Sequence, residues 1–167
     1  MKPFKRSSGV LLPVFSLPSN YGIGTIGKAA YDFIDFLHSA KQAYWQILPV
    51  GSTGFGDSPY QSFSTYAGNP YFIDLDLLIK DGLISKEDVD RFDWGNDPEK
   101  IDYGKIYSAK FAILEMAYKN GIEKDRKKYE KFKEENRSWL GDYSLFMAVK
   151  KHFDFKPRTQ WPEADIS

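Results

Sequence analysis

Two apolar runs with strand character, separated by one helical pattern, constrain the fold of this chain more than any other feature. Residues 9–13 (GVLLP) and 43–49 (AYWQILP) are rich in strand-forming side chains, and each run ends at a proline. Between them, apolar residues recur at the spacing of one helix face: Ala30, Phe33, Ile34 and Leu37. A strand, a helix over about residues 27–40 and a second strand predict a right-handed unit with parallel, buried strands, and therefore an α/β fold.

The sequence after about residue 75 shows helical patterns and no third strand of the same kind. Ser85 and Asp88 have the spacing of a capping box, which predicts the start of a short helix. We therefore expect two parts. Residues 1–75 should hold the strand-helix-strand unit with an aromatic loop over residues 51–71, and residues 76–167 should form a mostly helical subdomain.

The longest of these helices is expected over residues 103–119. Asp102 is placed to cap its first turn, and the Asn-Gly pair at residues 120–121 is a typical stop signal. The apolar stripe expected on this helix contains Tyr107, Phe111, Leu114 and Tyr118. Two more helices are expected over about residues 123–135 and 138–152.

Net charge and cysteine content argue against several classes of function. The 23 basic and 23 acidic residues balance, so we expect neither nucleic acid nor an anionic membrane as a partner. The chain has no cysteine and its two histidines, His38 and His152, lie far apart, so we expect no metal site. No run approaches the roughly 18 apolar residues of a membrane span. A soluble, cytoplasmic protein that binds a neutral ligand without a cofactor fits these features best.

Residues 22–27 (GIGTIG) match the G-x-G-x-x-G pattern of dinucleotide-binding loops. The context differs from that of such loops, because a segment containing Pro18 separates the pattern from the first strand. About 20 residues further on stand Ile47 and Leu48, where an acidic residue would hold the ribose. We favour a turn that leads into the helix, and a dinucleotide site is the alternative.

Residues 56–71 (GDSPYQSFSTYAGNPY) form a long segment without a strand or helix pattern. It has four aromatic rings, many hydroxyl and amide groups, one charge at Asp57, and no Leu, Val, Ile or Met. Long irregular loops are uncommon and usually functional, and this one leaves the carboxyl end of a parallel strand, where α/β folds place their active sites. Aromatic rings beside hydroxyl groups are suited to carbohydrates. The loop is expected either to bind such a ligand or to cover the core as a flap.

Several blocks of sequence carry a resemblance to a known family: SLPS (16–19), YGIG (21–24), YWQILP (44–49), GFGDSPYQSFS (54–64) and AGNPY (67–71). They closely resemble the start of the 4-α-glucanotransferases, also called amylomaltases or disproportionating enzymes, glycoside hydrolase family 77. Residues 102–103 and 139–148 also resemble that family, so the likeness spans nearly the whole chain. The block over residues 57–64 is its most specific part.

The resemblance implies a (β/α)8 TIM barrel that cleaves an α-1,4-glucan and passes the piece to the 4-OH of another glucan. The reaction retains configuration: one carboxylate forms a covalent glucosyl intermediate, and a second acts as acid and then as base. In the family these carboxylates come from later barrel strands, so we expect no catalytic residue in this chain and no transfer activity from it alone. The chain is expected to form an incomplete barrel, its first two strands with a helical insertion.

The resemblance also implies substrate-binding residues. Tyr60 matches the tyrosine that stacks under the sugar at the cleavage point, and Ser58 matches a hydrogen-bonding position on the donor side. Phe55 and Tyr107 match a second aromatic groove, although members often have tyrosine where Phe55 stands. Asp57 belongs to the same block, and it either takes part in substrate binding or caps the turn that follows it.

The expected partners are α-1,4-glucans, such as maltooligosaccharides and fragments of starch or glycogen. An alternative function is a stand-alone glucan-binding module without catalysis. The aromatic loop would suffice for such a module, and the sequence leaves this alternative open.

Overall fold

The computed structural model describes residues 6–54, 56–97 and 99–162 of the 167-residue chain. The chain divides into two compact units, Met1–Ile122 and Glu123–Ser167, and each unit is described by itself. The division near residue 75 that the sequence suggests follows the change from strand to helix patterns and stays a prediction.

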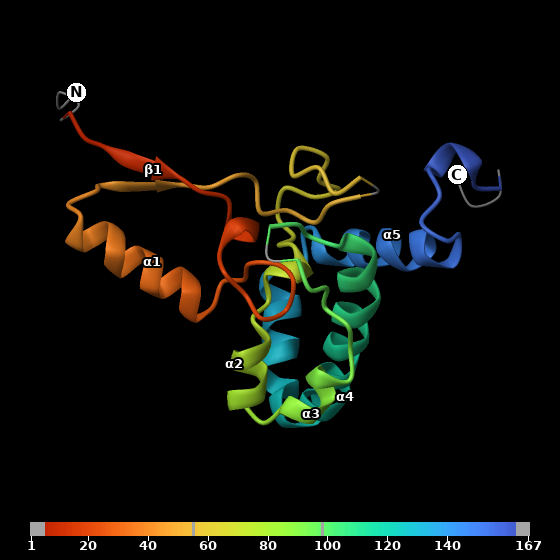
Figure 1. The fold of residues 1–167 in the computed structure, drawn as a ribbon. Helices are drawn as coiled ribbons and strands as arrows, with labels where there is room; N and C mark the ends of the chain where they lie inside the picture. The colour runs from red at the N-terminus through yellow and green to blue at the C-terminus, as the bar shows by residue number, and fades with distance from the viewer. Residues whose placement is uncertain (1–5, 55, 98, 163–167) are drawn as a thin grey trace. The chain divides into compact units, whose positions relative to one another are not determined.

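The first unit opens with the predicted strand-helix-strand element (Figure 1). β1 (Gly9–Leu11) and β2 (Tyr44–Gln46) pair in parallel, in a register that places Val10 opposite Trp45. α1 (Lys28–Ser39) connects the two strands. These observations confirm the α/β class and the parallel pairing of the strands.

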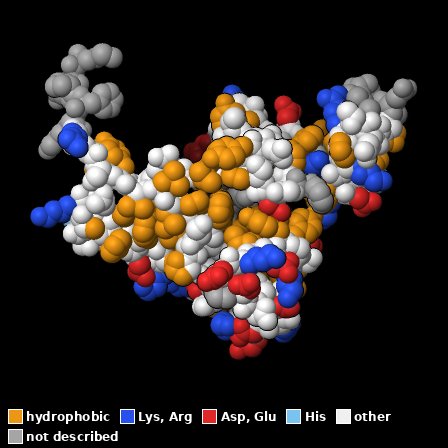
Figure 2. Space-filling view, turned by 45° about the horizontal axis from the view of Figure 1, so that its top comes forward, with side chains coloured by type: hydrophobic (Ala, Val, Ile, Leu, Met, Phe, Trp, Pro, Cys, Tyr) orange, Lys and Arg blue, Asp and Glu red, His pale blue; other side chains and the backbone are white. Residues whose placement is uncertain are grey.

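Both strands are exposed, so the prediction that they are buried is wrong. Leu11 is 55% exposed and Tyr44 is 63% exposed. α1 packs on the sheet through Phe33, whose ring meets the Trp45 ring edge to face at a centroid distance of 5.1 Å. Figure 2 shows hydrophobic side chains gathered over this part of the first unit. A two-stranded sheet with one helix leaves these side chains in contact with water, where they gain no burial energy.

Short helical turns follow each strand. η1 (Val14–Ser16) comes soon after β1, and η2 (Pro70–Phe72) ends the long loop after β2. α2 (Leu75–Lys80) begins at Asp74, whose carboxylate accepts a hydrogen bond from the Leu77 amide at 3.0 Å. A side-chain acceptor at this position satisfies an amide that the helix itself leaves without a partner.

α3 (Lys86–Asp90) starts at the predicted capping box. The Ser85 hydroxyl accepts from the Asp88 amide at 3.1 Å, and the Asp88 carboxylate accepts from the Ser85 amide at 3.0 Å. These reciprocal bonds confirm the prediction and explain why a helix as short as this one begins where it does.

α4 (Tyr103–Glu135) is one helix of 33 residues where the sequence predicts two. Its start agrees with the prediction, because the Asp102 carboxylate accepts from the Lys105 amide at 3.1 Å. Helix α4 passes without a break through the Asn-Gly pair that was expected to end it.

The reason for the missing stop lies in packing against Leu83. The Asn120 side chain donates to the Leu83 carbonyl at 2.8 Å instead of ending the helix. Gly121 is buried, and a Cβ at this position would lie 2.7 Å from a terminal methyl carbon of Leu83. The glycine therefore allows close packing within a helix and does not terminate it.

The buried face of α4 also differs from the predicted stripe. Tyr107 is 39% exposed, Phe111 is 41% exposed and Tyr118 is 55% exposed. The buried face consists of Ile106, Ala109, Lys110, Ile113, Ala117 and Gly121. Two stripes of this helix have helical spacing, and the one with the small residues is buried because it lets neighbouring elements come close.

Two hydrophobic cores hold the first unit together. One joins η1, α1, η2 and α4, and its buried residues are Val14, Leu17, Ile23, Ala30, Tyr71, Phe72 and Ile106. The other lies among α2, α3 and α4, and its buried residues are Tyr21, Leu75, Ile84, Val89, Trp94, Ala109, Ile113 and Ala117. Because the end of the long loop belongs to the first core, the loop is anchored to α4.

The second unit contains the last part of α4, α5 (Leu140–His152) and η3 (Arg158–Gln160). Trp161 is buried, and its ring stacks on that of Phe153 at a centroid distance of 5.6 Å. α5 agrees with the helix predicted over residues 138–152. In the part of the chain that the structure describes, no helix combines the length and the apolar character needed to cross a membrane.

Candidate functional site

The aromatic loop between β2 and η2 is ordered by hydrogen bonds although it contains no regular strand. Isolated antiparallel bridges join Gly51 to Gly68 and Thr53 to Ser62. The Ser62 hydroxyl donates to the Ser64 carbonyl at 2.7 Å. The two arms of the loop therefore run side by side, and the tip lies between Thr53 and Ser62.

Two consecutive turns form the tip of the loop. The Asp57 amide donates to the Gly54 carbonyl at 3.1 Å, and the Gln61 amide donates to the Ser58 carbonyl at 3.1 Å. Tyr60, the third residue of the second turn, is 72% exposed, whereas Ser58 is half-buried. An exposed ring on an ordered turn is suited to stacking on the apolar face of a sugar.

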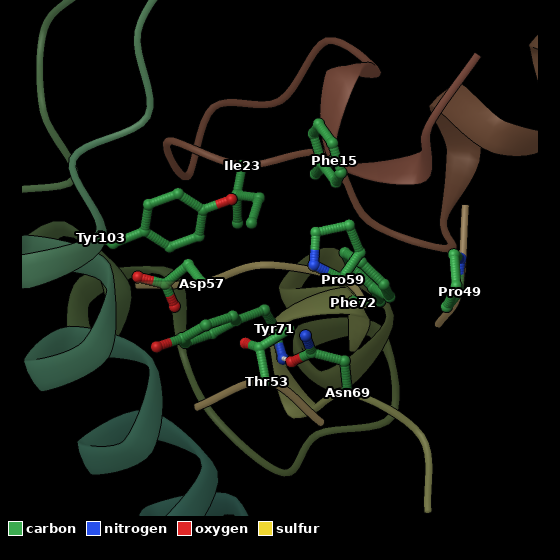
Figure 3. A pocket seen from close by; sticks show the side chains of 10 residues that line it. All are labelled: Phe15, Ile23, Pro49, Thr53, Asp57, Pro59, Asn69, Tyr71, Phe72 and Tyr103. Carbon is green, nitrogen blue, oxygen red and sulfur yellow. Dashed lines mark hydrogen bonds between the residues drawn. The ribbon is translucent and has the colours of Figure 1, made fainter. Parts of the chain in front are cut away.

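A small cavity lies beside Asp57, with a volume of about 10 Å³, on the scale of one water molecule. Figure 3 shows the Asp57 carboxylate on the side of this cavity where Tyr71 and Tyr103 lie. Thr53 lines the same cavity from the loop. The cavity is too small for a sugar, so its polar side chains serve the loop itself.

Burial changes the protonation of the groups around this cavity. It raises the pKa of the Asp57 carboxyl above its ordinary value, and a hydrogen bond from Thr53 acts in the opposite direction. Burial, and then the negative charge of Asp57, raise the pKa of Tyr71 and Tyr103. Both phenols therefore keep their protons to a higher pH than an ordinary tyrosine and can act as hydrogen-bond donors.

Tyr107 belongs to a cluster of rings that connects α4 with the end of the loop. Its ring lies 5.0 Å from that of Phe111, and Phe111 lies 6.1 Å from Tyr71 between centroids. Tyr71 in turn lies 6.0 Å from Tyr103. Burial raises the pKa of the Tyr107 hydroxyl. The ring is thus packed against an aromatic neighbour and remains 39% exposed.

The structure places the predicted site residues in two groups. Asp57, Ser58 and Tyr60 share the tip of the loop. Tyr107 lies on α4, beside the rings that anchor the loop. Phe55 lies outside the described residues.

Thr53, Tyr71 and Tyr103 line the cavity beside Asp57, and the sequence analysis did not single them out as site residues. Tyr71 and Tyr103 do stand in blocks that carry the family resemblance, which is the one signal that could have found them. No strand or helix period marks them, because they meet only through the fold.

The glycines of the GIGTIG segment contact the protein itself. A Cβ at Gly24 would lie 2.1 Å from the Val14 carbonyl oxygen, and one at Gly27 would lie 1.9 Å from a carboxylate oxygen of Asp74. These glycines are needed so that neighbouring segments can pack. This finding supports the turn interpretation and gives no support to a dinucleotide site.

Two other kinds of site receive no support from the described residues. Among them, no three His, Asp or Glu side chains lie close enough together to hold a metal ion. A wider hollow of about 950 Å³ lies between residues 15–24 and the segment before α4. Its polar lining residues, such as Asn20, Asn96 and Lys100, are exposed.

Comparison with known proteins gives a consistent result for this chain. The profile of a protein family described as 4-alpha-glucanotransferase matches residues 12–166. A 4-alpha-glucanotransferase from Streptococcus pneumoniae is 52% identical over 162 residues, covering 96% of this chain and 32% of the relative. One from Thermus thermophilus is 44% identical over 161 residues, covering 94% of this chain and 31% of the relative.

A solved structure shares the fold as well. The amylomaltase from Streptococcus agalactiae, in complex with acarbose, superposes with a TM-score of 0.90 at 46% sequence identity. The match covers 95% of this chain and 32% of the amylomaltase. The chain therefore spans about a third of the length of the proteins that it resembles.

Proposed function

Because the chain belongs to the 4-alpha-glucanotransferase family, we propose that the complete protein transfers a segment of an α-1,4-glucan to the 4-OH of an acceptor glucan. The chain corresponds to about a third of such an enzyme. In this proposal β1 and β2 are the first two strands of a (β/α)8 barrel. Residues 1–75 form its first strand-helix-strand unit, and residues 76–167 form a helical insertion.

The observation that carries the proposal is the exposed ring of Tyr60 on an ordered turn. The loop follows β2, and in (β/α)8 barrels the segments after the strands build the active site. A ring face under the sugar at the cleavage point attracts the positive charge that develops at the anomeric carbon. Tyr60 therefore stabilises the transition state more than the bound substrate, and Ser58 supplies a hydroxyl to the donor sugar.

The chemical step needs two carboxylates that this chain is not proposed to supply. In a retaining transfer one carboxylate attacks the anomeric carbon, while the other protonates the leaving oxygen and later activates the acceptor hydroxyl. We place both in the part of the enzyme that this chain does not cover. The chain alone is then a substrate-binding part without transfer activity.

A second aromatic groove is proposed at Tyr107, whose half-exposed ring is held by Phe111. Such a groove would contact long glucans beyond the cleavage point. Replacement of Tyr107 by Ala should therefore weaken the use of amylose and leave the kinetics with maltotriose nearly unchanged.

The first experiment tests which part of the chemistry lies in this chain. The 167-residue protein is incubated with maltotriose, beside a chimera in which it replaces the matching third of the S. pneumoniae relative. Glucose and longer oligomers should form with the chimera only. Turnover by the 167-residue protein would refute the proposed division of labour, and an inactive but folded chimera would count against the proposed transfer activity.

The second experiment tests the role of Tyr60 in the chimera. Tyr60→Ala should raise the activation free energy by about 2 kcal/mol, on the scale of desolvated cation–π contacts, and so lower kcat and kcat/KM together. Tyr60→Phe should cost clearly less because the ring face remains. Tyr118→Ala, which removes a 55% exposed ring from α4, is the control and should leave kcat unchanged. An unchanged kcat in Tyr60→Ala would remove the basis for stacking.

The alternative, a stand-alone glucan-binding module, draws support from one observation. The bridges and turns that order the loop are formed within the first unit, so the binding surface needs no further chain to keep its shape. Calorimetry of the 167-residue protein with maltoheptaose separates the two. Tight binding together with an inactive chimera would favour the module, and weak binding with an active chimera would favour the enzyme.

A further inference from the structure

We infer that Asp57 is a positioning residue, whose carboxylate holds the two turns that present Tyr60 and does not itself touch the glucan. This inference rests on the proposed function of Tyr60 and deepens it. It chooses between the two roles that the sequence allows for Asp57, a substrate contact and a residue that holds the turn.

The backbone at Asp57 is the first observation. Its φ is +52°, in the left-handed region that most side chains avoid, and it follows Gly56, whose φ is +94°. Aspartate and asparagine tolerate this region better than other residues because their short polar side chains can bond locally. Two successive residues with positive φ come directly before Ser58, where the second turn begins. The direction of the second turn, and hence of Tyr60, depends on this backbone conformation.

The direction of the carboxylate is the second observation. It lines the small cavity together with Thr53, Tyr71 and Tyr103, which come from the loop, from η2 and from the first turn of α4. Figure 3 shows the carboxylate and the two tyrosines along the same side of this cavity. Asp57 is only partly exposed, and the cavity that its carboxylate lines is too small to admit a sugar.

The partners of the carboxylate are themselves fixed. Thr53 is bridged to Ser62 on the opposite arm of the loop. Tyr71 is buried in the core that contains Ile106 of α4. Through these neighbours Asp57 links the tip of the loop to its opposite arm and to the core.

Tyr60 is placed differently from these neighbours of Asp57. It is 72% exposed, so packing contributes little to the orientation of its ring. The turn closed by the Gln61 amide and the Ser58 carbonyl sets that orientation. Loss of the Asp57 carboxylate should therefore act on substrates through Tyr60.

A double-mutant cycle in the chimera tests this coupling. Asp57→Gly accepts the left-handed backbone without strain but removes the whole side chain and frees the backbone, so Asp57→Asn, which keeps a short polar side chain without the charge, is measured beside it as the conservative variant. With Tyr60 present, Asp57→Gly should lower kcat/KM about tenfold, whereas in Tyr60→Ala it should lower kcat/KM less than about twofold. Asp57→Asn should recover most of the loss. Equal fold losses in both backgrounds would show that Asp57 acts independently of Tyr60 and would overturn the inference.

A second measurement uses the 167-residue protein and does not depend on activity. The backbone 15N order parameters of Tyr60 and Gln61 should fall from about 0.85 to about 0.6 or below in Asp57→Gly, while that of Ile113 in the core stays unchanged. Unchanged order at Tyr60 would overturn the inference. If Tyr60→Ala has normal kinetics, the proposed stacking fails, and the order parameters still decide whether Asp57 holds the turn.

Discussion

Lys110 should make the stability of the first unit rise with pH. This lysine is fully buried on α4, and its ammonium group donates a hydrogen bond to the carbonyl of Ile73. Burial lowers its pKa from 10.5 to about 8, and the nearby charge of Asp74 only partly opposes this effect. The substitution Lys110→Met tests this, because it keeps the length of the side chain and removes the charge.

The sign follows from which state binds the proton more tightly. The unfolded chain holds it with an ordinary lysine pKa near 10.4, and the folded chain releases it near pH 8. Below about pH 8 the folded state bears the full cost of a buried charge, and the cost falls as pH rises toward 10.4. Stability therefore increases with pH in this window.

The magnitude follows from the size of the shift. Each pKa unit corresponds to about 1.4 kcal/mol, so the buried charge costs about 3 kcal/mol at pH 7. Between pH 7 and pH 9 about 1 kcal/mol of this cost should disappear. Lys110→Met removes the cost but leaves the Ile73 carbonyl without its donor, which costs about 1–3 kcal/mol. The two effects should nearly offset each other at pH 7.

The assay is urea unfolding at pH 7, 8 and 9, with the difference between wild type and Lys110→Met as the result. From pH 7 to pH 9, the free energy of unfolding of the wild type should rise by about 1 kcal/mol relative to that of the variant. Buried Tyr21 and Tyr71 have raised pKa values and act in the opposite direction, but only as unfolded tyrosines ionise near pH 10. Lys119→Met, at an exposed lysine of the same helix, is the control.

A difference that does not change with pH would refute this reasoning. A direct check is the NMR titration of the Lys110 side chain, whose midpoint should lie near pH 8. A midpoint near 10.4 would show that burial does not destabilise the charged form.

Two further predictions concern packing in each unit, and urea midpoints test both. Gly27→Ala should lower the free energy of unfolding by about 1–3 kcal/mol, because the new Cβ would lie 1.9 Å from an Asp74 carboxylate oxygen. Gly141→Ala in α5 is the matched control. Its new Cβ meets nothing within 4 Å, so this variant should raise the free energy of unfolding by up to about 1 kcal/mol. Leu75→Ala should lower the free energy of unfolding by about 2–5 kcal/mol, because the Leu75 side chain is fully buried. The Leu145 side chain is 66% exposed, so Leu145→Ala should lower it by less than about 0.5 kcal/mol. Similar effects within either pair would contradict the packing described here.

The sequence alone predicted the elements that depend on neighbours along the chain. The parallel strand-helix-strand element follows from apolar periodicity, and the start of α3 follows from the Ser85 and Asp88 spacing. The family resemblance identified the block over residues 57–64, within the long loop, as its most specific part. Each of these features involves residues close in sequence, whose side chains report their own local structure.

The sequence did not predict which face of α4 is buried or where the helix ends. Gly121 carries a local stop signal, but its position against Leu83, far away in the sequence, makes it a packing residue inside the helix. Local propensity was overridden because packing of this kind stabilises a helix by more than a single glycine destabilises it.

The candidate site shows the same division between local and distant causes. The sequence alone predicted a turn directly after Asp57, because residues 58–59 are turn-forming residues. Only the tertiary structure places Asp57 at one cavity with Thr53, Tyr71 and Tyr103, because these residues come from separate elements. Their positions depend on how α4 and η2 pack in the core, and no pattern within the loop encodes that packing.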